Sequence, residues 1–290
     1  YNNRYDMMGG AFAHYIMGFG VKWFDLLEDV VLHVMNVDQA HYPAYWRGAV
    51  WMGHKETTNH SDPDTRKPRN DLLRQVRGWV LYYRLTGDLD ARDALIALAD
   101  YLYGTEAGVR DASIRNNAGP FVSLMWAYDE TGDEKYLQGA KRIMDGFEYR
   151  IEARRGAWPQ VHGHKTVQGN VPWMIGQVME PLYEMYRVTG DLKAAELLVS
   201  LAEAIIAENL RPDGDAYYSN NPAFGGNSGD NTNNLLATGL MYAYDLTGDE
   251  EFKRHAMTIL GHRIREANIG PWNYFHWLIP DLIKLYSEDQ

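Results

Sequence analysis

The stretch Leu-Tyr-Tyr-Arg-Leu-Thr-Gly-Asp at residues 81–88 decides the fold, because its last three residues recur three more times along the 290-residue chain. The four Thr-Gly-Asp triplets begin at Thr86, Thr131, Thr189 and Thr247, so they are separated by 45, 58 and 58 residues. Such periods are typical of two-helix repeats whose return connections vary in length. The repeat therefore predicts a series of helical hairpins.

The residues around each triplet keep the same offsets. A tyrosine stands three residues before each threonine, and apolar residues stand three, seven and ten residues after each aspartate. Residues at such spacings share one face of a helix, so we expect the apolar sets to be core and the tyrosines to be packing residues. The glycine can end the first helix in a left-handed conformation, and the aspartate can cap the second. The apolar sets are Ala91, Leu95 and Leu98; Tyr136, Ala140 and Ile143; Ala194, Leu198 and Leu201; and Phe252, Ala256 and Ile259.

A degenerate fifth copy surrounds Gly18-Phe19-Gly20, and a segment that opens at Pro271 resembles the first helix of a sixth pair. Six pairs favour closure, so we predict an all-α fold, a single (α/α)6 toroid over residues 1–290 that is one outer helix short. An open tetratricopeptide-like array is the alternative, but its period is shorter and more constant. We expect first helices at 6–18, 70–85, 117–130, 172–188, 231–246 and 272–286, and second helices at 20–37, 89–103, 133–150, 191–208 and 249–266.

Composition limits the class of protein. Hydrophobic residues make up 46% of the chain, enough for a sizeable core, and no stretch approaches the length of a membrane span. The net charge of −11 argues against nucleic acid and anionic membrane as partners. Zero cysteines exclude disulfides and thiolate metal sites. We expect no cofactor, an extracytoplasmic (periplasmic or secreted) location, and a chain excised from a longer protein whose other domains are its partners.

The long returns between hairpins, at 38–69, 104–116, 151–170, 210–230 and 267–271, should gather at the end opposite the tight turns. Functional residues favour loops on a rigid scaffold, so this end is the expected site. The returns are rich in aromatic, amide, imidazole and guanidinium groups. Aromatic faces stack on sugar rings, and the polar groups supply the hydrogen bonds that hydroxyls and carboxylates need. Carbohydrate is therefore the inferred substrate class.

A resemblance to a known group rests on the stretch at residues 81–88 together with the upstream Asp29, His33, Met35 and Asp38. The chain resembles (α/α) toroid carbohydrate-active proteins, especially the exo-rhamnogalacturonan lyase-like and unsaturated glucuronyl hydrolase-like group. The resemblance covers most of the chain as repeat architecture. Thr-Gly-Asp hairpins also occur in arabinofuranosidases and epimerases of the same shape, so it implies the fold and a sugar substrate rather than one reaction.

Two enzyme mechanisms compete for the expected site. A lyase acting on a uronic acid must neutralise the C6 carboxylate, remove the C5 proton and protonate the leaving oxygen, so it needs Arg or Asn beside a base and an acid. The Arg-rich returns of an acidic protein favour this lyase, with an acidic polysaccharide or oligosaccharide as substrate. The candidate catalytic residues are His54, His60, His162, His164 and Tyr217, and the candidate substrate-binding residues are Trp46, Trp51, Arg66, Arg69, Arg115, Asn116, Trp158, Tyr218, Asn231 and Trp272.

Three other interpretations stay open. A glycoside hydrolase would need two carboxyl groups, roughly 5.5 Å apart for retention or roughly 6.5–9.5 Å for inversion, and the returns contain six candidates. These are Glu56, Asp62, Asp64, Asp213, Asp215 and Asp230. The chain could also be a non-catalytic glycan-binding module of a larger protein. The four candidate histidines could hold zinc, but they lack the spacing of a helical His-Glu-x-x-His site, so we predict no metal.

Overall fold

The computed structural model describes residues 7–42, 47–50, 76–105, 114–153, 169–221 and 233–265. These residues form ten α-helices, one π-helical segment and two isolated β-bridges. None of the described helices is both long and apolar enough to cross a bilayer. The elements are α1 (Met7–Ile16), α2 (Lys22–His33), η1 (Val34–Asp38), α3 (Val76–Thr86), α4 (Leu89–Gly104), α5 (Ile114–Thr131), α6 (Glu134–Ala153), α7 (Pro172–Thr189), α8 (Leu192–Asn209), α9 (Asn234–Thr247) and α10 (Glu250–Arg265).

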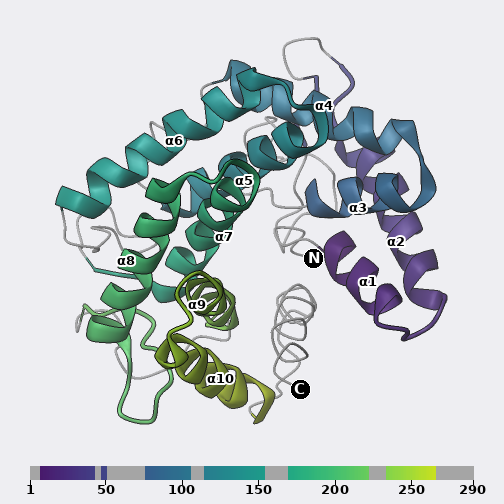
Figure 1. The fold of residues 1–290 in the computed structure, drawn as a ribbon. Helices are drawn as coiled ribbons and strands as arrows, with labels where there is room; N and C mark the ends of the chain where they lie inside the picture. Colours follow the sequence, from purple (N-terminus) through teal and green to yellow (C-terminus); the bar gives the residue numbers. More distant parts are fainter. Residues whose placement is uncertain are drawn as a thin grey trace. The chain divides into compact units, whose positions relative to one another are not determined.

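The helices follow one another as hairpins, as the repeat predicts, and Figure 1 shows the pairs from α1/α2 to α9/α10. Their ends lie within a few residues of the predicted ends, except that α3 is described only from Val76. The first helix predicted at 272–286 lies outside the described residues. One local prediction is wrong: the helix expected at 20–37 changes at Val34 into the π-helical η1, and the Gln39 amide donates to the Val34 carbonyl at 2.8 Å.

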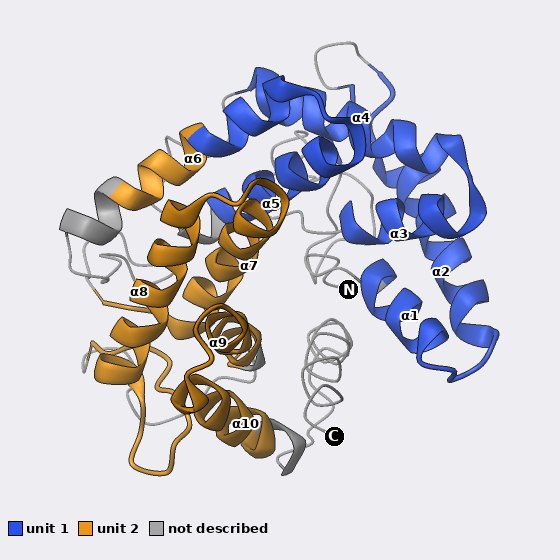
Figure 2. Ribbon diagram, in the orientation of Figure 1, with its two compact units in different colours: residues 1–110, 116–141, 271–280 blue, residues 111–115, 142–270, 281–290 orange. Residues whose placement is uncertain are grey.

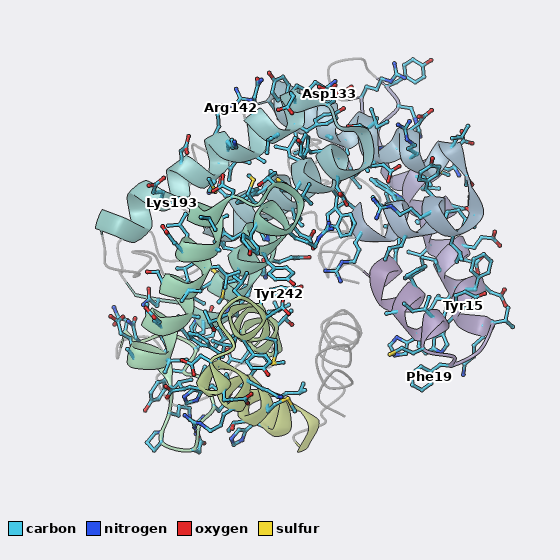
Figure 3. The ribbon with its side chains drawn as sticks, viewed as in Figure 1. Tyr15, Phe19, Asp133, Arg142, Lys193 and Tyr242 are labelled. Carbon is cyan, nitrogen blue, oxygen red and sulfur yellow. The ribbon has the colours of Figure 1, made fainter. Side chains whose placement is uncertain are left out.

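Each Thr-Gly-Asp triplet forms the predicted turn. At the third copy, Gly190 has a φ of +71° and its amide donates to the Tyr186 carbonyl at 2.7 Å. The Thr189 hydroxyl accepts from the Asp191 amide, and Asp191 Oδ1 caps α8 by accepting from the Lys193 amide at 3.0 Å. The same bonds recur at Thr86, Thr131 and Thr247. Figure 3 labels Asp133, the capping residue of α6.

The expected core positions are buried in every repeat. All twelve apolar residues at the predicted offsets are at most 5% exposed, including Leu95, Leu198 and Ile259 at 0%. Full burial of one such side chain contributes about 1.5–3 kcal/mol. The turn tyrosines bond locally as expected, since Tyr128 donates to Glu134 and Tyr244 donates to Glu250. The three tryptophans of first helices, Trp79, Trp126 and Trp173, are buried.

The chain divides into two compact units (Figure 2). Unit 1 comprises residues 1–110, 116–141 and 271–280, and unit 2 comprises residues 111–115, 142–270 and 281–290. In unit 1, α3 packs against α1, α2 and α4. In unit 2, α7 packs against α8 and α9, and α9 packs against α10. The described parts of the third and fourth long returns belong to unit 2, so the candidate site begins there.

Candidate functional site

The structure describes only part of the predicted site. Tyr217 and Tyr218 lie in the fourth return and are both half-buried. Arg115 and Asn116 lie in the first turn of α5. The other predicted site residues lie outside the described residues and stay predictions: His54, His60, His162, His164, Trp46, Trp51, Arg66, Arg69, Trp158, Asn231 and Trp272.

Tyr217 is positioned by a short hairpin that follows α8. Its amide donates to the Asn209 carbonyl at 2.9 Å, and Leu210 and Ala216 form an antiparallel bridge. Gly214, with a φ of +84°, supplies the turn that this pairing requires. The first half of the fourth return is therefore an ordered support that places two tyrosines directly after a paired strand segment.

Two of the predicted carboxylates lie in the same hairpin. Asp213 forms an ion pair with Arg211 at 3.0 Å, and its carbonyl accepts from His262 of α10 at 3.0 Å. Asp215 is 2% exposed, and its amide is held by Asp213 Oδ1. Because these contacts brace the turn, we assign both residues to the support of Tyr217 rather than to a catalytic pair.

A cluster of amides joins the end of the third return to the fourth. Asn170, at the start of α7, donates its backbone amide to Asn220 Oδ1 at 2.7 Å. Glu208 of α8 accepts from the side chains of both asparagines, at 2.9 and 3.0 Å. Gly169 leaves room for this contact, because a Cβ there would lie 2.8 Å from Ser219 Oγ. The predicted convergence of long returns is thus observed for these two.

Buried amides lie beneath this hairpin. Asn209 is fully buried, and neither of its side-chain polar atoms has a hydrogen-bond partner. Asn233, directly before α9, donates to the Ala216 carbonyl at 2.7 Å while its Oδ1 has no partner. A buried polar group without a partner costs about 1–3 kcal/mol. Such a cost is tolerated most readily where polar groups serve a site.

The helices that lead away from this end run side by side in the same direction. Gly176 of α7 lies so close to α9 that a Cβ there would be 2.3 Å from the Leu235 carbonyl oxygen, and a Cβ on Gly239 would meet Met179. Further along, Tyr183 stacks on Tyr242 with 4.3 Å between ring centroids. Figure 3 labels Tyr242 on α9. Because the pairings advance together, α7 and α9 are parallel and both begin at the long returns.

A stripe of polar residues runs along α7. Trp173, Gln177, Glu180 and Glu184 are spaced four, three and four residues apart, and we call them the α7 polar stripe. At 100° per residue, the stripe lies on the side of α7 opposite the buried apolar face of the helix. That opposite face carries Val178, Leu182 and Met185. The stripe is the largest polar feature on a helix that is otherwise apolar.

The two carboxylates of the stripe differ in their surroundings. Glu184, near the tight turn, is bound by Arg187 through two contacts of 2.7 and 2.8 Å. Glu180, at the middle of α7, is 3% exposed. Burial of a carboxylate is costly unless it is hydrogen-bonded or neutral, so a buried glutamate at such a position is a candidate for acid or base chemistry.

Sequence reasoning missed Gln177 and Glu180, because it searched the returns and treated first helices as core. The signal was present: polar residues recur at helical spacing within a segment rich in Met, Val and Leu. Within the described residues, no group of three or more His, Cys, Asp or Glu side chains is placed to hold a metal ion. The histidines of the zinc alternative lie outside that part of the chain.

Comparison with known proteins supports the fold. Residues 72–166, less than half of the chain, match the family described as Beta-L-arabinofuranosidase, GH127 catalytic domain. No curated protein is significantly similar in sequence. Similar solved structures include a cellobiose 2-epimerase from Bacillus thermoamylovorans, with a TM-score of 0.69, 14% identity, and coverage of 90% of this chain and 74% of that chain.

Two further structures cover nearly all of the chain. An unsaturated glucuronyl hydrolase variant from Streptococcus agalactiae has a TM-score of 0.66 and 15% identity, and covers 98% of this chain and 80% of that chain. A polysaccharide lyase has a TM-score of 0.73 and 9% identity, and covers 99% of this chain and 91% of that chain. The chain therefore has the (α/α) toroid fold of carbohydrate-active enzymes, which confirms the predicted fold class and resemblance.

Proposed function

We propose that the chain is a glycoside hydrolase in which Glu180 is the general acid. The observation that carries the proposal is the buried Glu180 carboxyl, on the α7 polar stripe between the hydrogen-bonded long returns and the tight turn. The match to a family described as a glycosidase catalytic domain supports hydrolysis. A glycosidase needs a carboxylic acid that protonates the leaving oxygen, which a buried glutamate can supply.

The reaction also needs a second carboxylate. In an inverting enzyme it activates water, and in a retaining enzyme it attacks the anomeric carbon. We propose Asp230 for this role, because it lies four residues before α9, whose first turn packs against Gly176 of α7. Gln177, one turn before Glu180, would donate hydrogen bonds to sugar hydroxyls, and Trp173 would supply an apolar surface.

The substrate that we propose is an acidic oligosaccharide. The parallel helices α7 and α9 both direct their amino-terminal ends toward the long returns, and a helix N-terminus carries about half a positive charge. That partial charge favours a sugar carboxylate at this end. The guanidinium groups predicted there from the sequence, those of Arg66, Arg69 and Arg115, would add to it.

A polysaccharide lyase is the second candidate. It is favoured by the solved lyase whose structure aligns with nearly the whole of this chain. In that reaction Tyr217, held half-buried by the hairpin after α8, would protonate the leaving oxygen, and one of the predicted imidazoles, such as His162, would remove the C5 proton.

One experiment separates these functions. The protein is incubated with unsaturated and saturated glucuronate-containing or galacturonate-containing oligosaccharides, and reducing ends and ultraviolet absorbance are followed together. A hydrolase releases reducing ends without forming a new conjugated double bond, so saturated substrates give no absorbance rise. A lyase raises both signals. Binding of the substrates without either signal would contradict both enzymatic proposals and favour a glycan-binding module.

A further inference from the structure

A cavity of unit 1 lies along the outer helix of the second hairpin, away from the residues used so far. Its volume is about 600 Å³, and its walls include Arg47, Asp93, Ala97, Asp100 and Tyr101. We call these five residues the α4 groove. A neighbouring hollow of about 200 Å³ shares three of them and extends the groove toward η1. Cavities of this total size are typical of small-ligand sites.

The groove exists because its floor is made of small residues. Asp93, Ala97 and Asp100 recur at spacings of four and three, so they share one face of α4. The alanine between two carboxylates leaves a hollow that a longer side chain would fill. Gly48 lies against this face so closely that a Cβ there would be 1.9 Å from the Ala97 carbonyl oxygen. The segment that carries Arg47 is therefore held directly on α4.

Hydrogen bonds fix that segment. Gln39, the residue that follows η1, donates its side-chain amide to the Ala94 carbonyl at 2.8 Å and to the Gly48 carbonyl at 3.3 Å. The backbone of residues 39–40 also pairs with residues 48–50. The walls of the groove are thus positioned without a ligand, which lowers the entropic cost of binding one.

The chemistry of the walls suits a sugar. Arg47 is exposed, and neither it nor Asp93 forms an ion pair within the part of the chain that the structure describes. Arg47 offers several N–H donors, Asp93 offers acceptors, and Tyr101 offers an aromatic ring, which is the combination that hydroxyls and sugar faces require. Asp93 and Asp100 outnumber the one guanidinium of the groove, so a polyanion would be repelled.

We propose that the α4 groove binds a neutral oligosaccharide, as a second glycan site separate from the α7 polar stripe. The groove would hold a carbohydrate chain on the outer face of the second hairpin whichever reaction the stripe performs. A polycation is the competing ligand, because of the two aspartates. It is less favoured because Arg47 stands within the same cavity.

Isothermal titration calorimetry of the whole chain tests the proposal. The probes are cellohexaose, xylohexaose and arabinohexaose, with spermidine and polygalacturonate as charged comparisons. Ala97→Leu fills the floor with a good helix former, and Arg47→Ala removes the donor. Lys141→Ala, on an exposed position of α6, is the matched loss of a positive charge. Circular dichroism verifies that each variant is folded.

We expect at least one neutral hexasaccharide to bind, and both groove variants to raise its Kd by about tenfold or more, equivalent to about 1.4 kcal/mol, while Lys141→Ala leaves it unchanged. Both groove variants should keep wild-type turnover, and Glu180→Gln should keep hexasaccharide binding. Failure of the hydrolase proposal would therefore not be mistaken for failure of this one. No binding of any hexasaccharide, binding that survives Ala97→Leu, or binding of spermidine instead would overturn the proposal.

Discussion

The backbone amide of Asn170 donates a hydrogen bond to the side chain of Asn220 at 2.7 Å, although 50 positions separate the two residues. Both asparagines also donate to the same oxygen of Glu208. This arrangement connects the entry of α7, which leads into the polar stripe, to the return that carries Tyr217. The contact is therefore the described link between the scaffold and the candidate site.

Replacement of Asn170 by aspartate tests this link. The new carboxylate loses a donor to Glu208 and places a like charge beside it, so the free energy of unfolding should fall by about 2 kcal/mol at neutral pH. Urea unfolding measures the change. At acidic pH, where the carboxyls become protonated, part of the loss should return. Gln138→Glu, an exposed substitution on α6, is the control and should change stability by less than about 0.5 kcal/mol.

Three glycines separate backbone strain from close packing. Gly190→Ala forces a left-handed φ of +71° on a residue with open space around it, so it should cost about 1–2 kcal/mol. Gly176→Ala places a Cβ against the Leu235 carbonyl and should cost at least about 2 kcal/mol. Gly146→Ala, in a helix with open space, should stabilise by about 0.5–1 kcal/mol.

Activity distinguishes these variants further. Gly176→Ala moves α7 away from α9 and should lower turnover, whereas Gly190→Ala lies at the opposite end and should not. Thermal unfolding and turnover of the three proteins provide both readouts. Equal losses of activity in Gly176→Ala and Gly190→Ala would argue against a site that depends on the contact between α7 and α9.

Alkaline stability should depend on Tyr136. Burial raises the pKa of Tyr136 to about 12, and a hydrogen bond to Asp100 contributes to the rise. A raised pKa means that the folded state holds the proton more tightly, so this contribution is complete below about pH 10 and is lost as the pH rises to about 12. Tyr136→Phe should therefore make the fall of unfolding free energy over this range less steep.

The order of the two causes can be tested as well. Asp100→Asn removes the hydrogen-bonded charge but leaves the burial of Tyr136, which is the larger cause. It should therefore reduce the steepness by less than Tyr136→Phe does. Denaturant unfolding between pH 9 and 12, read by far-ultraviolet circular dichroism, measures both. A larger effect of Asp100→Asn would assign the raised pKa chiefly to the carboxylate.

The hairpins were predictable because their determinants are local. A Thr-Gly-Asp turn needs only a glycine that adopts positive φ, a threonine that bonds to its own helix and an aspartate that caps the next one. The helical spacing of Leu95, Leu198 and Ile259 then identifies the buried face. None of these features depends on where another hairpin lies, so sequence alone was sufficient for the hairpins and their core.

The unpredicted parts depend on contacts between distant segments. The π-helical η1 ends where Gln39 is held by Ala94, which lies 55 positions away. The convergence of Asn170 and Asn220 was expected only in general terms, because no sequence pattern names the pair. Glu180 was missed since residue type within a return was taken as the mark of function, while the pattern that identifies it lies inside a first helix.

The central claim is that the α7 polar stripe cleaves a glycosidic bond through Glu180. The most direct test is the turnover number of Glu180→Gln on the oligosaccharide that the wild type cleaves fastest, compared with Glu203→Gln on the exposed face of α8. Loss of a general acid should lower turnover by about 10²–10⁴-fold while thermal stability is kept, and Glu203→Gln should match the wild type. Turnover of Glu180→Gln within twofold of the wild type would contradict the account.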